Sequence, residues 1–283
     1  MIVKALMATA VCALMFGCTD SSQDQSVMPS ARTSSVSYVC VGMETSKRFG
    51  ECPGCKLDSD RMDSLFKNKF GYNGVLLQSE NATRRSVAEA INNAVLRTPE
   101  DGLFIFYYSG HGGQEKLDWG NTEPDGADSA DEYLCLYDSY LLDDEIWKMI
   151  SKCKGRVFMC FDACHSQTMF RTITYDIALE KGEAVPLDAA IVPSGNGFVM
   201  SPRGISLDTD GMKMLCWSGC LEAEYSYGST NGGVMTNAIL AHWKPGIGYA
   251  ELWKATKAEV SVKQPGQHPV ETRYGTGFNE AFR

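Results

Sequence analysis

The chain has 283 residues, of which 44% are hydrophobic and 22% charged, and its formal net charge is −9. This length and composition suit one large globular domain with a sizeable apolar core. The acidic balance argues against a nucleic-acid partner, because binding to phosphates needs a basic surface, and it favours a cationic substrate.

The first residues, 1–17, are typical of a secretory signal peptide. Lys4 precedes an apolar run that ends in "MFGC", which is similar to a bacterial lipobox. We therefore expect a lipid on Cys18 and a location in the bacterial cell envelope, held to the membrane by that lipid alone, with plain secretion as the alternative. Residues 18–36 are polar and predict a flexible tether. The remaining residues, 37–283, form the predicted domain.

Short apolar runs and helix-period segments alternate along this domain. The predicted buried strands are 38–41, 75–77, 103–108, 157–161 and 214–217. The predicted helices are 59–70, 83–96, 143–150, 233–243 and 249–260. This order indicates an α/β fold, a three-layer α/β/α sandwich around a mostly parallel sheet. Residues 171–211 lack periodicity and are predicted to form a loop excursion.

Two of the predicted strands run directly into reactive side chains. Strand 103–108 continues into Ser-Gly-His-Gly-Gly, which contains His111, and strand 157–161 continues into Asp-Ala-Cys-His-Ser, which contains Cys164. The helix predicted between them makes the connection a crossover, so the strands should be parallel. If they are neighbours, roughly 4.8 Å apart, the imidazole and the thiol meet at the carboxyl edge of the sheet.

An imidazole beside a thiol is the arrangement that acyl transfer needs, because it supplies a base for a nucleophile. Gly112 and Gly113 let the backbone approach a substrate closely. We expect the N–H groups of Gly112 and Cys164 to stabilise the oxyanion, a contribution of about 3 kcal/mol for each donor. His165 follows the thiol directly, so its side chain is expected to point away from it, and His242 and His268 lie in no comparable context.

At these motifs the sequence resembles the caspase and metacaspase family of cysteine peptidases, in clan CD. The segments "FYYSGHGGQ" and "DACHS" are similar to its histidine and cysteine motifs, 53 residues apart between His111 and Cys164. Further segments resemble the family over about 37–227, and they include "CPGCKLDSDRMDSLF" and "WSGCLEAEYSYG". Asp162 before the cysteine favours a metacaspase over a true caspase. The resemblance implies a caspase-like fold and an endopeptidase with a His/Cys dyad.

The same resemblance implies an acidic pocket for the substrate residue before the cut. The implied substrate-binding residues are Cys55, Asp58, Ser109, Asp162, Glu222 and Glu224. Carboxylates here predict cleavage after Arg or Lys, with Arg preferred for its planar fork. Cys55 has two alternative roles, a disulfide with Cys52 or half of a zinc site, although no second CxxC motif completes a zinc set.

The resemblance implies no obligatory cofactor, but it offers one calcium site. Its carboxylates match Asp131, Asp143 and Asp144, whereas Arg171 occupies the position of a further acidic residue in the family. Calcium binding is therefore expected to be weak or absent. Alternatively, Asp143 and Asp144 simply cap the helix 143–150.

Two other functions remain open at this point. A clostripain-like peptidase of the same clan would use the same strand ends and the same specificity. A catalytically inactive, caspase-like binding lipoprotein would not need to keep both His111 and Cys164, so the intact pair argues against it.

Overall fold

The structure is a computed structural model that describes residues 35–115, 131–163, 191–194, 197–200, 211–221 and 224–282. The chain divides into two units, Met1–Thr33 and Ser34–Arg283, and every described residue belongs to the second. The predicted signal peptide, the lipidation site Cys18 and nearly all of the tether lie outside the described residues.

A six-stranded sheet forms the centre of the described unit, in the order β15-β12-β9-β5-β1-β4. The strands are β1 (Val36–Gly42), β4 (Asn73–Gln78), β5 (Leu103–Ser109), β9 (Arg156–Asp162), β12 (Lys213–Ser218) and β15 (Val270–Tyr274). All neighbours are parallel except β15, which runs antiparallel to β12. The predicted mostly parallel sheet is confirmed, and β15 is an edge strand that the apolar runs did not predict.

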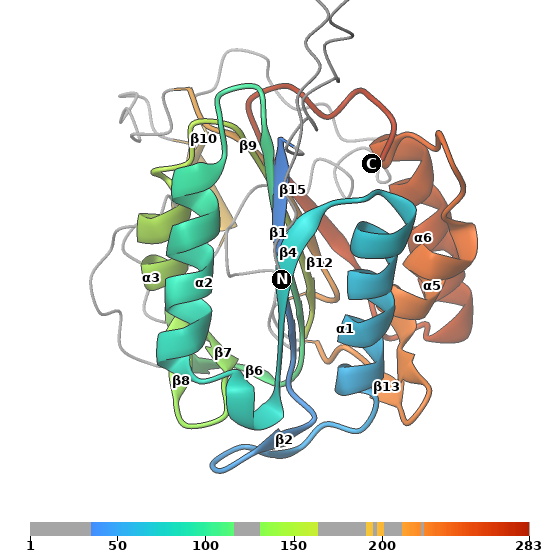
Figure 1. The fold of residues 1–283 in the computed structure, drawn as a ribbon. Helices are drawn as coiled ribbons and strands as arrows, with labels where there is room; N and C mark the ends of the chain where they lie inside the picture. The colour runs from blue at the N-terminus through green and yellow to red at the C-terminus, as the bar shows by residue number, and fades with distance from the viewer. Residues whose placement is uncertain are drawn as a thin grey trace, which may run out of the picture. The chain divides into compact units, whose positions relative to one another are not determined.

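Helices cover both faces of this sheet, which confirms the three layers (Figure 1). Helices α2 (Arg84–Arg97) and α3 (Asp143–Ile150) lie on one face. Helices α1 (Cys55–Ser64), α5 (Val234–His242) and α6 (Tyr249–Lys263) lie on the other. The helix predicted at 59–70 begins earlier, at Cys55, and finishes as the π-helical turn η1 (Leu65–Lys69), whereas the short 3-10 turn η2 (Ser79–Asn81) precedes α2.

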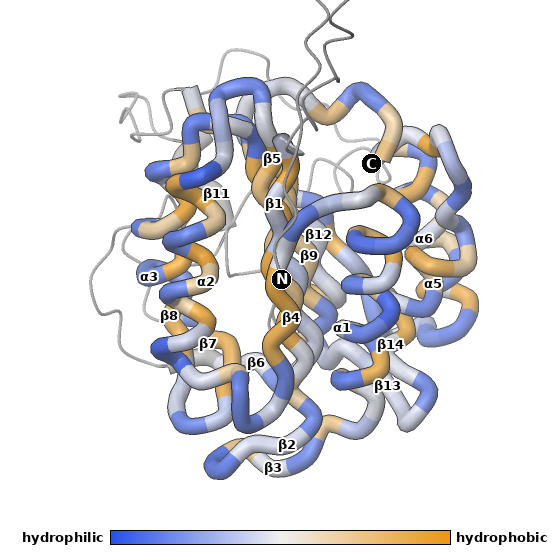
Figure 2. The backbone as a smooth tube through the Cα atoms, viewed as in Figure 1, coloured by the Kyte–Doolittle hydropathy of each residue, from blue (hydrophilic) through white to orange (hydrophobic). Residues whose placement is uncertain are grey.

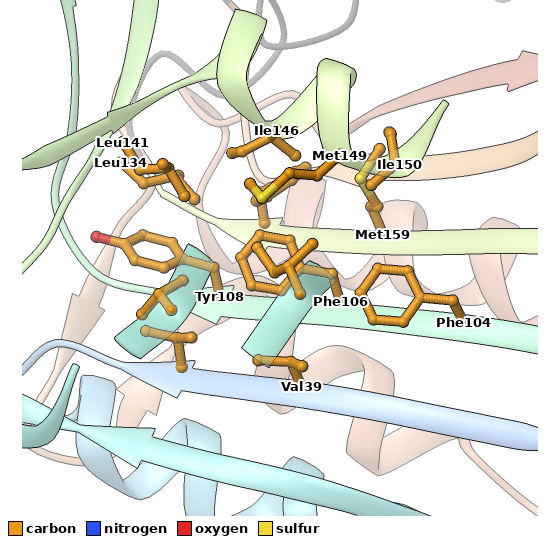
Figure 3. Packing of buried hydrophobic residues seen from close by; sticks show 14 of the residues in the cluster. Val39, Phe104, Phe106, Tyr108, Leu134, Leu141, Ile146, Met149, Ile150 and Met159 are labelled. Carbon is orange, nitrogen blue, oxygen red and sulfur yellow. The ribbon is translucent and has the colours of Figure 1, made fainter. Parts of the chain in front are cut away.

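The core is divided by the sheet into two apolar clusters. Along β5, Phe104, Phe106 and Tyr108 pack toward α3, as Figure 3 shows, while Leu103 and the other alternate residues face the opposite cluster. Every residue of β5 is buried, because helices cover both faces of a parallel sheet. The hydropathy colouring in Figure 2 shows the same apolar strands between helices with polar outer sides.

Small antiparallel pairs gather where the parallel strands end (Figure 1). They are β2 (Thr45–Ser46) with β3 (Gly50–Glu51), β6 (Gly112–Glu115) with β7 (Asp131–Cys135) and β8 (Tyr140–Leu142), and β13 (Gly228–Ser229) with β14 (Gly232–Gly233). Within the predicted excursion 171–211, β10 (Ile191–Ser194) and β11 (Gly197–Met200) pair as an antiparallel hairpin, so that prediction is wrong for these residues. Among the described residues, no helix is both long and apolar enough to cross a membrane.

Candidate active site

His111 lies at the carboxyl edge of the sheet, two residues beyond the end of β5. Its backbone carbonyl accepts hydrogen bonds from the hydroxyl of Tyr108, at 2.6 Å, and from the N–H of Cys135, at 3.0 Å. The Tyr108 hydroxyl also donates to the carbonyl of Cys135 at 2.7 Å. The histidine backbone is therefore anchored to both β5 and β7.

The imidazole of His111 is oriented by a backbone carbonyl. Its Nε2 atom lies 2.9 Å from the carbonyl oxygen of Glu51, at the end of β3. Because a carbonyl only accepts hydrogen bonds, Nε2 carries the proton of the neutral ring, and Nδ1 is left as the basic nitrogen. The side chain of His111 is only partly buried.

Gly112 has a backbone N–H that β7 does not use. The bond from Cys135 N–H to the His111 carbonyl makes these two residues a bonded pair, and Gly112 lies opposite Leu134 in the next pair. Bonded and non-bonded pairs alternate along an antiparallel ladder, so Gly112 occupies a non-bonded position. Its N–H therefore points away from β7.

Strands β5 and β9 are parallel neighbours, as the sequence predicted, with Ser109 opposite Asp162. Cys164, the predicted nucleophile, lies outside the described residues. Ala163, just before it, is buried, and its carbonyl accepts a hydrogen bond of 3.4 Å from the thiol of Cys220. Cys220 thus contacts the chain one residue before Cys164.

Two of the predicted pocket carboxylates, Asp58 and Asp162, form what we call the acidic pair. Asp58 comes from the first turn of α1 and is fully buried. Its Oδ2 atom accepts hydrogen bonds from the hydroxyl of Ser109, at 2.9 Å, and from the N–H of Gly233, at 2.8 Å. Its Oδ1 atom accepts no hydrogen bond from the described residues.

Asp162, at the end of β9, has donors at both carboxylate oxygens. Thr236 donates its hydroxyl and its N–H to Oδ2, at 2.7 Å and 2.9 Å, and the hydroxyl of Ser226 donates to Oδ1 at 2.5 Å. The hydroxyls of Tyr107 and Thr236 lie 2.7 Å apart and continue the network into the core.

Burial, and after it the charge of Asp162, raise the pKa of Asp58 to about 7. The N–H of Gly233, the hydroxyl of Ser109 and the guanidinium of Arg61 oppose this shift. Burial also raises the pKa of Asp162, against the hydrogen bonds from Ser226 and Thr236. Because both carboxyl groups are buried, negative charge at this site is costly, and a bound cation would relieve that cost.

Two glycines of β14 make room for the acidic pair. A Cβ atom on Gly232 would lie 2.1 Å from Oδ1 of Asp58, and one on Gly233 would lie 2.1 Å from Oδ2 of Asp162. Neither position tolerates a side chain without moving a carboxylate. These two glycines lie outside the segments that resemble the family. In the sequence, only the pair "GG" after "GSTN" marks their position.

A buried glutamine, Gln267, connects the segments around Asp162. Its amide donates to the carbonyl of Gly219, at 2.8 Å, and to the hydroxyl of Ser226, at 3.1 Å, and it accepts the N–H of Tyr227 at 3.0 Å. The hydroxyl of Ser226 in turn donates to Asp162, so Gln267 holds the acidic pair in place indirectly, through Ser226.

The other predicted pocket residues have separate positions. Cys55 begins α1 and forms a disulfide with Cys52, which is one of the two alternatives left open for it. The carboxylate of Glu224 binds the side chain of His268 at 2.6 Å and the N–H of Leu221 at 3.3 Å, so it braces its own loop. Glu222 lies outside the described residues.

The predicted calcium ligands begin two neighbouring elements. Asp143 and Asp144 are buried in the first turn of α3, where Asp143 accepts the N–H of Asp144 at 3.0 Å, and Asp131 begins β7. Within the part of the chain that the structure describes, no group of three or more His, Cys, Asp or Glu could hold a metal ion. Asp143 and Asp144 lie in the first turn of α3, which is the position that the helix-capping alternative requires.

An α/β/α sandwich with a histidine and a carboxylate pair at its carboxyl edge has a caspase-like fold. A family profile described as Peptidase_C14, Caspase domain, matches residues 39–276. The chain therefore belongs to the caspase domain family, and it is a cysteine-type peptidase resembling metacaspases.

Individual proteins are similar to this chain in sequence or in fold. Metacaspase-1 of Ajellomyces capsulatus is 23% identical over 291 residues, which cover 82% of this chain and 80% of that protein. The crystal structure of protein GSU0716 from Geobacter sulfurreducens superposes with a TM-score of 0.60 at 25% identity, covering 86% of this chain and 94% of that one. Caspase-1 from Spodoptera frugiperda, at 13% identity, has a TM-score of 0.55 over 85% of this chain and 86% of its own, and it shares the fold.

Proposed function

We propose that this peptidase is an endopeptidase that cleaves peptide bonds after Arg or Lys. The observation that carries this proposal is the acidic pair at the same sheet edge as His111, with Oδ1 of Asp58 left without a donor among the described residues. A guanidinium or ammonium group of the substrate would supply that donor. Charged hydrogen bonds of this kind contribute roughly 1.5–3 kcal/mol.

In the proposed reaction, Cys164 attacks the carbonyl carbon of the substrate and His111 takes its proton at Nδ1. The bond from Nε2–H to the carbonyl of Glu51 keeps Nδ1 available. The N–H groups of Gly112 and Cys164 would stabilise the oxyanion, and the register that directs the Gly112 N–H away from β7 supports this role. The histidine then protonates the leaving amine, and water hydrolyses the thioester.

The test compares fluorogenic peptides that end in Arg, Lys, Asp or Leu. Cys164→Ala and His111→Ala should each abolish cleavage while the protein stays folded, whereas Cys160→Ala, in the buried part of β9, should mainly lower stability. Arg should be cleaved faster than Lys, because only a guanidinium presents a planar fork. Faster cleavage after Asp or Leu, or full turnover by folded Cys164→Ala, would contradict the proposal.

The alternatives are less well supported. The match of the caspase profile over residues 39–276 and the metacaspase relatives favour this family over a clostripain-like peptidase. An inactive binding scaffold would not need an oriented imidazole, yet the His111 ring is held by Glu51.

We also propose that the peptidase is anchored to the cell envelope through a lipid on Cys18, with 18–36 as a tether. The sequence "MFGC" and the polar residues behind it support this proposal. Palmitate labelling of the full chain should be lost in Cys18→Ala. Unlabelled wild-type protein in the soluble fraction would instead indicate a secreted enzyme.

A further inference from the structure

The disulfide between Cys52 and Cys55 joins two parts of the site that otherwise belong to different elements. The two Cα atoms lie 5.9 Å apart, in the ordinary range for a disulfide. The bridge spans the connection between β3 and α1. Cys52 is partly accessible to solvent, whereas Cys55 is buried with 6% of its surface exposed.

On its first side, the disulfide holds the residue that follows Glu51, whose carbonyl orients His111. The N–H of Cys52 also donates to the carbonyl of Glu44 at 2.8 Å, which closes the β2–β3 hairpin. A displacement of Cys52 therefore passes through one peptide unit to the carbonyl that binds Nε2 of His111.

On its second side, the disulfide holds the first residue of α1, one turn before Asp58. The helix begins after Gly54, which has a φ of 94°, and the N–H of Asp58 donates to the carbonyl of Gly54 at 3.0 Å. A Cβ atom on Gly54 would lie 2.0 Å from the carbonyl oxygen of Ser229, so this turn packs closely against β13. The helix start is consequently fixed next to the acidic pair.

We propose that the Cys52–Cys55 disulfide is a redox-modified positioning site, which couples the orientation of His111 to the placement of Asp58. This inference rests on the proposed function, since it concerns the same His111 and acidic pair. In the oxidised protein, the β3 end and the α1 start form one covalent unit. In the reduced protein, the Glu51 carbonyl is held only by the hairpin, so His111 is less well oriented.

The reductant would be a small or protein dithiol. Its thiolate attacks Sγ of Cys52, the S–S bond breaks, and Cys55 leaves as a thiolate that takes up a proton. The second thiol of the reductant then attacks the mixed disulfide, which frees the Cys52 thiol and leaves the reductant as its own disulfide. Two electrons and two protons pass to the protein, and the partly exposed Cys52 is the sulfur that such a reagent can reach.

The two redox requirements of the site oppose each other. Cys164 must be a free thiol to act as the nucleophile, whereas Cys52 and Cys55 must be oxidised to position His111. We therefore expect activity to pass through a maximum as the dithiol-to-disulfide ratio rises, and to fall about fivefold at the reducing end. If the only redox requirement were a free thiol at Cys164, activity would instead rise steadily with the dithiol-to-disulfide ratio.

The first experiment measures kcat and KM for an Arg peptide across dithiothreitol buffers of increasing reducing strength, with the full chain. The double variant Cys52→Ser/Cys55→Ser should show the lowered kcat and no decline at the reducing end. Cys153→Ser removes a partly buried free cysteine between α3 and β9, at the opposite edge of the sheet, and should behave as the wild type. If the kcat of the wild type rose steadily with reducing strength while Arg peptides were still cleaved, the inference would be overturned but the proposed function would stand.

The second experiment does not depend on activity. In the folded Cys164→Ala protein, differential alkylation should find Cys52 and Cys55 blocked before reduction and reactive after it. The 15N signals of the His111 ring should report protonated Nε2 in the oxidised form and an averaged tautomer in the reduced form. Free thiols at both positions in the oxidised protein, or unchanged His111 signals, would overturn the inference even if no Arg peptide were cleaved.

Discussion

Asp162 and Asp58 lie in two regions of the site that hold a carboxylate in different ways. Around Asp162, the end of β9 meets α5 and the 226–227 segment, and donors reach both oxygens. Around Asp58, the first turn of α1 meets Ser109 and Gly233, and only Oδ2 receives donors from the described residues. Under the proposed function, this difference predicts that Asp162 maintains the local structure and that Asp58 contacts the substrate.

The largest effect should come from Asp162→Asn. The amide would face the hydroxyl and N–H of Thr236 or the hydroxyl of Ser226 with an N–H₂ group, so at least one buried donor loses its acceptor. We expect the free energy of unfolding to fall by about 3 kcal/mol, together with loss of the preference for Arg. Urea denaturation measures the first effect, and wild-type stability in this variant would remove the proposed structural role.

Asp58→Asn should separate binding from stability. The amide oxygen can still accept from Ser109 and Gly233, whereas the charge that would bind a guanidinium is lost. We expect the ratio of kcat/KM for Arg over Leu peptides to fall about 10- to 100-fold, which corresponds to a charged hydrogen bond. An unchanged ratio would show that Asp58 does not contact the substrate.

The stability of the same Asp58→Asn variant has an expected pH dependence. The pKa of Asp58 is about 7 when folded, above its unfolded value of about 3.9. As the pH rises, the unfolded chain therefore loses this proton before the folded protein does. The protonated carboxyl makes its full contribution to the free energy of unfolding below about pH 4, and this contribution is lost as the pH rises through 7. Relative to the wild type, the variant should gain stability over this interval, and a constant difference between pH 4 and 8 would contradict the raised pKa.

The preference for Arg should weaken in acid for the same reason. Protonation of Asp58 below about pH 7 removes the charge that faces the guanidinium, while Asp162 and Arg61 also act on this group. The ratio of kcat/KM for Arg over Leu peptides cancels any pH effect on the chemical step that both substrates share. We expect the ratio to decline several-fold from pH 8 to pH 6 and to become flat in Asp58→Asn.

The smallest effect on the preference for Arg should come from Gln267→Glu. This substitution keeps the size of the side chain but removes the donors to Ser226 and Gly219. We expect the Arg preference to fall about fivefold. Gln264→Glu makes the same chemical change three residues earlier and should have no effect. Because Gln267 acts through Ser226, the double variant with Ser226→Ala should lose no more than the larger single effect, and additive losses would refute that route.

Much of this architecture could be predicted from the sequence. The five parallel strands are continuous apolar runs, and His111 and Asp162 are found because each follows such a run. The partners of the acidic pair could not be predicted, since Gly233 lies 175 residues from Asp58, and short polar segments carry no periodic signal. Strand β15 was missed because Val270–Tyr274 contains charged residues and pairs on one side only.

The wide spread of these residues along the chain has a consequence for biosynthesis. A ribosome delivers Asp58 early, Asp162 much later, and Thr236 and Gln267 only after β12. A partly synthesised chain can assemble β1, β4 and β5 but lacks the groups that complete the proposed specificity site. We expect nascent fragments to be inert toward Arg peptides, and cleavage to appear during refolding only with the phase in which β15 docks on β12, so the peptidase cannot act before its synthesis is finished.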